Sequence, residues 1–489
     1  MIDWYTAGVA LIATMGTLLF GFDTGIATTT IAHGSWKEYM NHPSDAMTGA
    51  VVALYIMGET LGAITQSLLG DKIGRIHFMQ MMCVIVTIGS TIQTAAINMG
   101  MFLAGRAIAG IAVGGIIGTV PMYLSEISRP EQRGLLGGIA GAGISFGALL
   151  ANWIGYAGSY AGSYAPDAPI QWRLPLALQI PWGFVMLLGL LTFMPDSPRQ
   201  LIRAGKIEAA RRALSKMRSD TSPDEFVAEL DQMQAQIEFE MERGIASFGE
   251  ALQLYRHRCL VTIVVQVMTS LTGGNVVQYY QTIVYRSLGM EPRTILALAG
   301  VYGTVAFVVN YIALVFFMNR WGRRKMIIGG LASIVLVLIY TAVMQRQFQE
   351  TDNRVGKGFT IRGIYMFVTA YYGLINSATW LYSAEVLPLA LRAKVMGLAC
   401  ACHFIVNIGV TQAGPSAFST IHENYYYVFV GCTAFFTVIA YFFFEETRQK
   451  TLEEISEAFG DEVTSSEDMH VPRAKLDVEE KSQQIEHHA

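Results

Sequence analysis

Apolar segments of about 20 residues, each long enough to cross the roughly 30 Å core of a bilayer, recur along almost the whole chain. Charged residues make up only 15% of the sequence and hydrophobic residues 52%, whereas soluble domains are about 25% charged. The pattern therefore predicts an all-α integral membrane protein with twelve transmembrane helices. The predicted spans are 8–30, 47–69, 77–97, 101–124, 135–157, 175–194, 260–285, 294–318, 326–345, 361–383, 395–414 and 425–444.

The distribution of Lys and Arg predicts the orientation, because short cytoplasmic loops carry an excess of both. Loops after the second, fourth, eighth and tenth spans hold ten of them, against four in the loops after the first, fifth, seventh and eleventh. The loop after the ninth span is an exception, because it lies on the predicted outer side and still holds four basic residues. We therefore expect both termini in the cytoplasm, with the plasma membrane as the default location.

The only long polar stretch within the chain separates the sixth span from the seventh. Residues 201–217 place apolar side chains at helical spacing with Arg and Lys opposite, as in an amphipathic surface helix. The acidic end of the chain has the composition of a disordered tail. We predict a first six-helix half at 1–195, a cytoplasmic helical linker at 196–258, a second half at 259–447 and a largely disordered cytoplasmic tail at 448–489.

Internal repetition supports the two halves. "GDKIGR" at 70–75 is echoed by "NRWGRRK" at 319–325, and "SEISRPEQRG" at 125–134 by "AEVLPLALRAK" at 384–394. In the second pair a glutamate precedes an arginine by seven residues in both copies. These echoes, at nearly one offset, indicate two pseudo-symmetric units from one ancestor.

Two acids interrupt the apolar segments. Asp23 lies about two turns inside the first span, and Glu59 lies in the second. A charge at mid-helix costs at least about 2.5 kcal/mol, so each acid needs a partner, a cavity or a proton. Elsewhere, Gly110, Gly114 and Gly118 have the spacing that allows two helices to approach closely.

Ten motifs in order make the chain similar to the sugar porter branch of the major facilitator superfamily, and "WRLPLALQ" resembles its fungal members. The resemblance covers Gly16 to about Ala458. The motifs are GFDTG, GDKIGR, GRAIAGIAVGG, PMYLSEISRPEQRG, WRLPLALQIP, PDSPR, GGNVVQYY, GRRK, AEVLPLALRAK and EETRQKTLEE.

The resemblance implies alternating access by two halves and pairs Asp23 with Arg106 of the fourth span. Proton-coupled sugar porters have an acid at the position of Asp23, where passive ones have an amide. Asp23 and Arg106 are thus the expected proton-coupling residues, with the proton as coupling ion and no other cofactor. The residue of the second half that corresponds to Asp23, by the offset between the two halves, is Asn275, a neutral amide.

The resemblance also implies a network of charges at the cytoplasmic ends of the helices that holds the outward-open state. We expect exposed pairs worth about 0–1 kcal/mol each, so that only several together can bias the equilibrium. The expected members are Asp71, Arg75, Glu126, Arg133, Asp196 and Arg199 in the first half, and Arg323, Arg324, Glu385, Arg392 and Glu446 in the second.

Several sugar-binding positions match, and several depart. Gln266, Asn275, Trp380 and Asn407 match, whereas a glutamine pair is replaced by Thr269 and Ser270. A glutamine expected in the fifth span falls on Gly141, an asparagine and an acid are replaced by the aromatic residues Phe307 and Tyr372, and Phe404, preceded by His403, stands where a tryptophan is expected. Short side chains should enlarge the site and aromatic ones make it less polar, which favours a disaccharide, deoxy sugar, polyol or sugar acid over D-glucose.

Proton-coupled import of a sugar-like solute by a monomer is the leading hypothesis. A passive facilitator and a transporter-like sugar sensor are the alternatives. An enzyme is disfavoured because the sequence has no HExxH motif, nucleophile elbow or metal-ligand cluster. The five cysteines are scattered without metal-ligand spacing, and no basic patch studded with aromatic residues indicates a nucleic acid.

Overall fold

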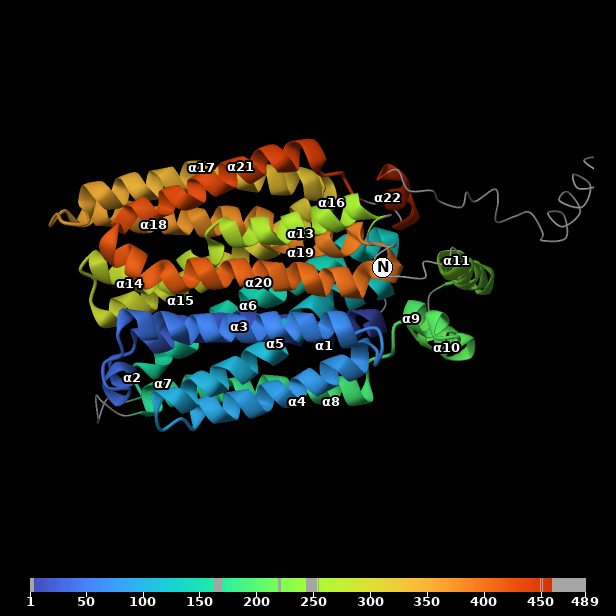
Figure 1. Ribbon diagram of the computed structural model, residues 1–489, viewed down its shortest axis with the longest axis horizontal. Coiled ribbons are helices and arrows are strands. Elements are labelled where there is room, and N and C mark those ends of the chain that lie inside the picture. The colour runs from blue at the N-terminus through green and yellow to red at the C-terminus, as the bar shows by residue number, and fades with distance from the viewer. Residues whose placement is uncertain are drawn as a thin grey trace, which may run out of the picture.

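The computed structural model is a bundle of long helices whose axes run along one direction of the molecule (Figure 1). It describes residues 4–161, 169–218, 221–242, 253, 255–448, 450 and 452–459. Eleven helical segments in these ranges are long and apolar enough to cross a membrane. The one predicted span outside these eleven, the tenth (361–383), is also helical, in three consecutive pieces: α18, the π-helical η2 and α19. The predicted all-α membrane fold is confirmed.

Most helices extend beyond the predicted spans. The first group comprises α1 (Trp4–Ala32), α3 (Asp45–Leu69), α4 (Arg75–Thr94), α5 (Met99–Ile127), α6 (Pro130–Gly158), and α7 (Ile170–Ala177) followed by α8 (Gln179–Thr192). The second comprises α13 (Arg256–Leu271) with α14 (Gly274–Ser287), α15 (Pro292–Ile312) with η1 (Ala313–Phe317) and α16 (Met318–Trp321), α17 (Arg323–Phe348), α18 (Arg354–Ala370) with η2 (Tyr371–Ile375) and α19 (Asn376–Val386), α20 (Leu389–Thr420) and α21 (Tyr425–Phe443). Short helices α2 (Gly34–Tyr39) and η3 (His422–Asn424) lie in connections.

Two kinds of break interrupt the membrane helices of the second group. Gly273 separates α13 from α14. Its φ of +81° is a left-handed backbone conformation that ends the first helix and that glycine adopts readily. The segments η1 and η2 are π-helical, a form frequently found at functional sites. Discontinuous helices near the middle of a bundle are typical of transporter binding sites.

The predicted linker forms amphipathic helices at one end of the bundle, which we call the insert end. These are α9 (Pro198–Arg203), α10 (Ile207–Met217) and α11 (Pro223–Glu242), and α22 (Leu452–Ala458) lies at the same end (Figure 1). Ile202, Leu214 and Leu230 are among the buried residues of a small separate core that joins α9, α10 and α11. Apart from α22 and its immediate neighbours, the tail predicted at 448–489 lies outside the described residues.

The helices before the linker and those after it form two adjacent groups (Figure 1). Helices α3 and α20 pack along each other, as do α6 and α15. Ser67 Oγ donates to the Lys394 carbonyl at the insert end (2.8 Å), and Gln412 Nε2 donates to the Ala46 carbonyl at the other end (3.3 Å). The two groups therefore touch at both ends of the bundle.

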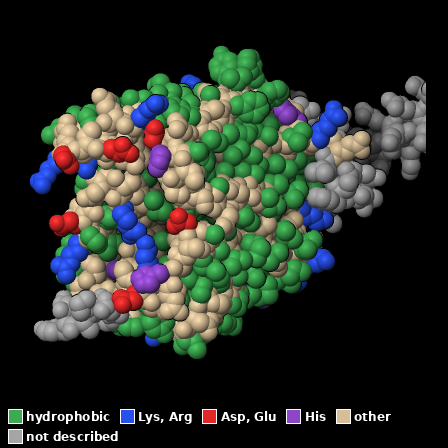
Figure 2. Space-filling view, turned by 60° about the vertical axis from the view of Figure 1, so that its left-hand side comes forward, with side chains coloured by type: hydrophobic (Ala, Val, Ile, Leu, Met, Phe, Trp, Pro, Cys, Tyr) green, Lys and Arg blue, Asp and Glu red, His purple; other side chains and the backbone are tan. Residues whose placement is uncertain are grey.

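A wide apolar belt surrounds the bundle between two charged ends. Figure 2 shows hydrophobic side chains covering the belt on the visible face, with charged side chains gathered toward one end and a few at the other. Large apolar residues such as Phe184, Leu188, Leu336 and Phe435 are more than half exposed. In water such a patch would be unstable, but facing lipid it is what a membrane-spanning bundle requires.

Glycines of α5 bring α3 into backbone contact, as their spacing predicts. An added Cβ would collide with the Tyr55 carbonyl oxygen at Gly110 and with the Glu59 carbonyl oxygen at Gly114. At Gly118 it would lie 3.5 Å from Gln66 Oε1, an ordinary contact. Gly110 and Gly114 therefore fix the spacing of α3 and α5.

We predict that Gly114→Leu forces α3 and α5 apart and destabilises the bundle by about 1–3 kcal/mol or more. The measurement is the thermal midpoint of the purified protein in detergent. Gly118→Ala is the matched control and should leave the midpoint nearly unchanged. A Gly114→Leu protein as stable as wild type would contradict the packing described here.

Candidate functional site

A buried ion pair lies inside the first group of helices. Asp23 of α1 is 2% exposed and Arg106 of α5 is 1% exposed, and Arg106 Nη1 donates to Asp23 Oδ1. The ring of Tyr55, on α3, lies 4.1 Å from Arg106 Cζ, close enough for a cation–π contact. The predicted contact between Asp23 and Arg106 is present.

Two more helices of the first group, α8 and α4, complete this polar centre. Gln179 Nε2, at the start of α8, donates to Asp23 Oδ1 (3.1 Å). Gln179 Oε1 in turn accepts hydrogen bonds from Ser90 (3.1 Å) and Gln93 of α4. We did not predict Gln179, although the polar residue that ends "WRLPLALQ" was a signal. Asp23 therefore accepts hydrogen bonds from one charged and one neutral donor, and the Tyr55 hydroxyl lies close to it.

Removing either partner of this pair would leave a charge inside a low-dielectric bundle. A buried ion pair is stable only while its geometry and hydrogen bonds are complete. A proton on Asp23 would cancel the attraction and free Arg106 from α1. The arrangement can therefore couple protonation to movement of α1 against α5.

Four of the predicted substrate residues converge in the second group. Gln266 of α13 donates through Nε2 to Ser383 Oγ of α19 (3.0 Å), and its backbone carbonyl lies 2.9 Å from His403 Nδ1 of α20. Ser270 Oγ donates to the His403 carbonyl (2.8 Å), and the Trp380 ring lies 5.8 Å from the His403 ring. Asn407 lies one turn beyond His403 on α20. Ser383, three residues after Trp380, was not predicted.

Two buried acceptor oxygens in this cluster lack a hydrogen-bond donor among the described residues. They are Gln266 Oε1 and Asn407 Oδ1. Unpaired buried acceptors are costly, and a polyhydroxylated solute supplies the O–H donors that would satisfy them. The cluster is thus suited to a sugar-like ligand.

The other predicted substrate residues, Thr269 and Asn275, form none of these contacts. Thr269 Oγ1 donates to the Val265 carbonyl of its own helix (2.7 Å), and Asn275 is half-buried at the start of α14. The expectation that Gly141 enlarges the site is wrong: α19 packs against it, with Ser377 filling the space of a side chain and Asn376 Nδ2 donating to the Gly141 carbonyl (3.1 Å). The glycine serves helix contact and opens no volume there.

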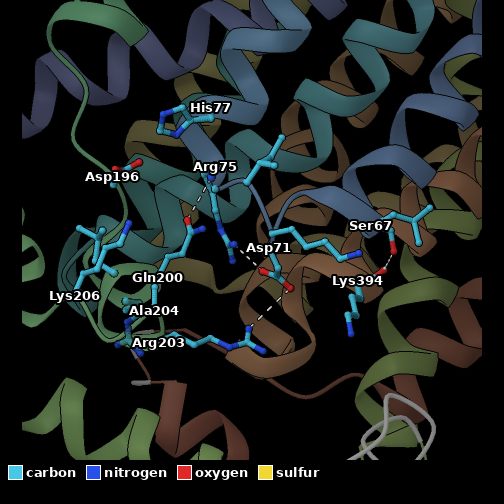
Figure 3. A pocket seen from close by; sticks show the side chains of 16 residues that line it. Ser67, Asp71, Arg75, His77, Asp196, Gln200, Arg203, Ala204, Lys206 and Lys394 are labelled. Atoms are coloured by element: carbon cyan, nitrogen blue, oxygen red, sulfur yellow. Dashed lines mark hydrogen bonds and ion pairs between the residues drawn. The ribbon is translucent and has the colours of Figure 1, made fainter.

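The network predicted in the first half lies at the insert end. Arg75 donates through Nη1 to Asp71 (2.7 Å) and through Nη2 to Glu126 (3.0 Å). Figure 3 shows Asp71 between Arg75 and Arg203, beside a cavity of about 440 Å³ that Asp196 and Arg199 also line. The side chain of Arg133 lies outside the described residues.

The second half repeats this geometry. Arg323 Nη2 donates to Glu385 Oε1 (2.9 Å), and its backbone N–H donates to Glu446 Oε1 (2.9 Å), as the Arg75 N–H does to Gln200 Oε1 (3.3 Å). The Arg324 N–H donates to the second Glu446 oxygen (3.2 Å). A glycine at positive φ precedes each repeated arginine, Gly74 at +91° and Gly322 at +86°. The structural repeat matches the sequence repeat.

Two features of the network differ from expectation. Arg75, Glu126, Arg323 and Glu385 are each no more than 3% exposed, so these are buried pairs instead of exposed ones. The Arg75 and Arg323 pairs also join residues of one half. Arg392 donates to the Leu387 carbonyl (2.9 Å) and lies within electrostatic reach of Glu126 in the other half. Contact between the halves at this end thus involves Arg392 and the Ser67–Lys394 hydrogen bond.

Comparison with known proteins places these features in context. A family model described as "Sugar (and other) transporter" matches residues 9–459. The MFS-type transporter criB of Aspergillus cristatus is 32% identical over 463 residues, covering 93% of this chain and 93% of that protein. The low-affinity glucose transporter HXT4 of Saccharomyces cerevisiae is 31% identical over 465 residues, covering 91% and 79%.

Solved structures show the same fold at lower identity. The proton:xylose symporter XylE bound to 6-bromo-6-deoxy-D-glucose matches with a TM-score of 0.83 and 21% identity, over 94% of this chain and 100% of that one. The inward open conformation of XylE from E. coli matches with a TM-score of 0.70 and 21% identity, over 93% and 99%.

Proposed function

The chain belongs to the sugar (and other) transporters, the sugar porter family of the major facilitator superfamily, and we propose that it imports a sugar or sugar-like solute together with a proton. It is a multi-pass membrane protein of a family of transporters, not enzymes. The buried Asp23–Arg106 pair carries the proposal. XylE, whose fold this chain shares, is described as a proton:xylose symporter.

In the proposed cycle the insert end faces the cytoplasm, as the excess of basic residues in its loops favours. With the outer side open, Asp23 takes a proton and releases Arg106, so that α1 can move and close over the solute. Opening of the inner side returns the proton to the cytoplasm and restores the ion pair. One proton falling through about 100 mV supplies about 2.3 kcal/mol, enough for roughly fifty-fold accumulation of the solute.

The solute would bind where Gln266, Ser270, Trp380 and Asn407 converge around His403. Trp380 supplies an aromatic face against which a sugar ring can pack. The unpaired oxygens of Gln266 and Asn407 can accept hydrogen bonds from its hydroxyl groups and so fix its orientation. The ring centroid of Phe20, on α1, lies 6.4 Å from that of Phe404, so the first half also contributes to the surroundings of this cluster. The proposed ligand is a polyhydroxylated solute.

The first experiment expresses the protein in transporter-deficient cells and follows uptake and external pH while sugars, polyols and sugar acids are offered in turn. Symport predicts that a transported solute makes the medium more alkaline. Uptake without any pH change would favour a passive facilitator instead. Solute binding with no uptake would favour a transporter-like sensor.

We predict that Gln266→Ala weakens solute binding by about three- to tenfold, because one neutral hydrogen bond contributes about 0.5–1.5 kcal/mol. The measurement is the KM of uptake for the solute found in the screen. Thr262→Val, one turn away on α13, is the control, because the Thr262 hydroxyl bonds the Arg258 carbonyl of its own helix (2.9 Å). Equal KM values for both variants would remove Gln266 from the binding site.

A further inference from the structure

Glu59 of α3 is a second buried acid that the Asp23–Arg106 pair does not explain. It is 1% exposed, and its Oε1 has no hydrogen-bond donor among the described residues. An ionised carboxylate buried in this way is expensive unless a cation balances it or a proton neutralises it. Its surroundings show which of these is available.

Charged and titratable groups approach Glu59 from three helices besides its own. Asp23 of α1 and Arg106 of α5 lie within electrostatic reach, and so does Tyr279 of α14. On α3, Tyr55 lies one turn before Glu59; its ring stacks on Arg106, and its buried hydroxyl is near Glu59 without forming a hydrogen bond of standard geometry. Helix α20 also packs along α3, but its His403 is turned to the Gln266 carbonyl of α13. Arg106 is thus the one cation that we find in reach among the described residues.

Two buried acids therefore lie within electrostatic reach of one guanidinium, and only Asp23 is hydrogen-bonded to it. Arg106 uses Nη1 for Asp23, whereas its buried Nη2 has no acceptor among the described residues. An unused donor on Arg106 and an unused acceptor on Glu59 occupy the same buried centre. With both acids ionised the centre would carry a net negative charge, and with one proton it is neutral.

We propose that Glu59 is a second proton carrier and that Arg106 alternates between the two carboxylates; this inference rests on the proposed symport. With Asp23 bound to Arg106, the proton resides on Glu59. In the exchange the O–H bond of Glu59 breaks and an O–H bond forms at Asp23, while the guanidinium passes from Asp23 to Glu59. The net charge of the centre stays constant during this exchange. Asp23 then gives its proton to the cytoplasm and takes Arg106 back, and Glu59 receives the next proton from the outer side, so that the proton of the proposed cycle reaches Asp23 by way of Glu59.

The exchange has a mechanical consequence because the acids stand on different helices. At Gly110 and Gly114, α3 and α5 are in backbone contact, so a bond from Arg106 to Glu59 lies within a fixed pair of helices. A bond from Arg106 to Asp23 ties that pair to α1. Moving the proton from Glu59 to Asp23 therefore releases α1 without exposing a charge.

The direct test needs no solute, since the probe is the proton. The full-length protein in lipid vesicles is titrated while infrared difference spectroscopy follows the C=O band of protonated carboxyl groups. We expect a buried protonated carboxyl at neutral pH in wild type, absent in Glu59→Gln and retained in Glu59→Asp. It should also be absent in Asp23→Asn, because Glu59 then takes Arg106 and ionises. A band that persists in Glu59→Gln, or that is unchanged in Asp23→Asn, overturns the exchange.

Transport separates this inference from the proposed function. In Glu59→Gln we expect the number of protons entering per solute to fall about tenfold or more, with Glu59→Asp retaining most of the coupling. Wild-type symport that Glu59→Gln leaves intact would overturn the role of Glu59 and leave the proposed function standing. Uptake by wild type without protons would overturn the proposed function, whatever the infrared result.

Discussion

The Asp23→Asn protein should exchange solute across the membrane but should not accumulate it. Asparagine keeps the size of aspartate and can still accept a hydrogen bond from Gln179, and Glu59 can balance the charge of Arg106, so we expect the site to remain folded. It cannot gain or lose a proton, so the link between the proton gradient and α1 is lost. At about 100 mV we expect accumulation to fall from up to about fifty-fold to the external level.

The measurement for Asp23→Asn pairs two assays on the same vesicles: counterflow of labelled solute, and uptake driven by an imposed pH gradient. Counterflow near the wild-type rate shows that the protein is folded and that its binding site is intact. Asp45→Asn, at the exposed start of α3, is the control for loss of an acid elsewhere. Gradient-driven accumulation that survives in Asp23→Asn would make Asp23 a structural partner of Arg106.

The second large effect is expected at the insert end. In Arg323→Ala the Glu385 carboxylate stays buried and keeps only a neutral donor among the described side chains, the Thr447 hydroxyl (2.7 Å). Breaking a buried ion pair on one side costs about 3–5 kcal/mol, because the other charge is left uncompensated. We expect a large fall in the thermal midpoint and in the monodisperse yield.

Two variants separate this explanation from a general loss of charge. Arg323→Ala combined with Glu385→Gln removes both charges and should recover most of the lost stability. Arg346→Ala breaks an ion pair with Glu423 in which Arg346 is 74% exposed, and it should cost no more than about 1 kcal/mol. A double variant as unstable as Arg323→Ala would show that the charge of Glu385 is not the cause.

The sequence was sufficient for the helices and for their division into repeats. Hydrophobic length dictates a membrane span directly, and the echoes around Arg75 and Arg323 correspond to the same local geometry in both halves. The π-helical segments η1 and η2 could not be predicted, because a changed hydrogen-bond register leaves the apolar pattern intact. Nothing in the composition of 361–383 indicates the break.

The site was predicted as a set of positions, without the contacts that decide its chemistry. Asp23 stood out because an acid in an apolar helix is costly, whereas Gln179 is a neutral amide in an apolar run and gives a much weaker signal. Burial also depends on tertiary packing: the Arg75 and Arg323 pairs were expected at the surface but are enclosed. At Gly141 a missing side chain indicated space, yet α19 occupies it.

Accumulation by wild-type protein in vesicles tests the central claim most directly. Purified protein is reconstituted with equal solute inside and outside, and a pH gradient, acidic outside, is the only driving force. We predict that the solute concentrates inside and that a protonophore releases it to the external level. Equal concentrations throughout, in vesicles that still exchange labelled solute, would contradict symport and show a passive facilitator.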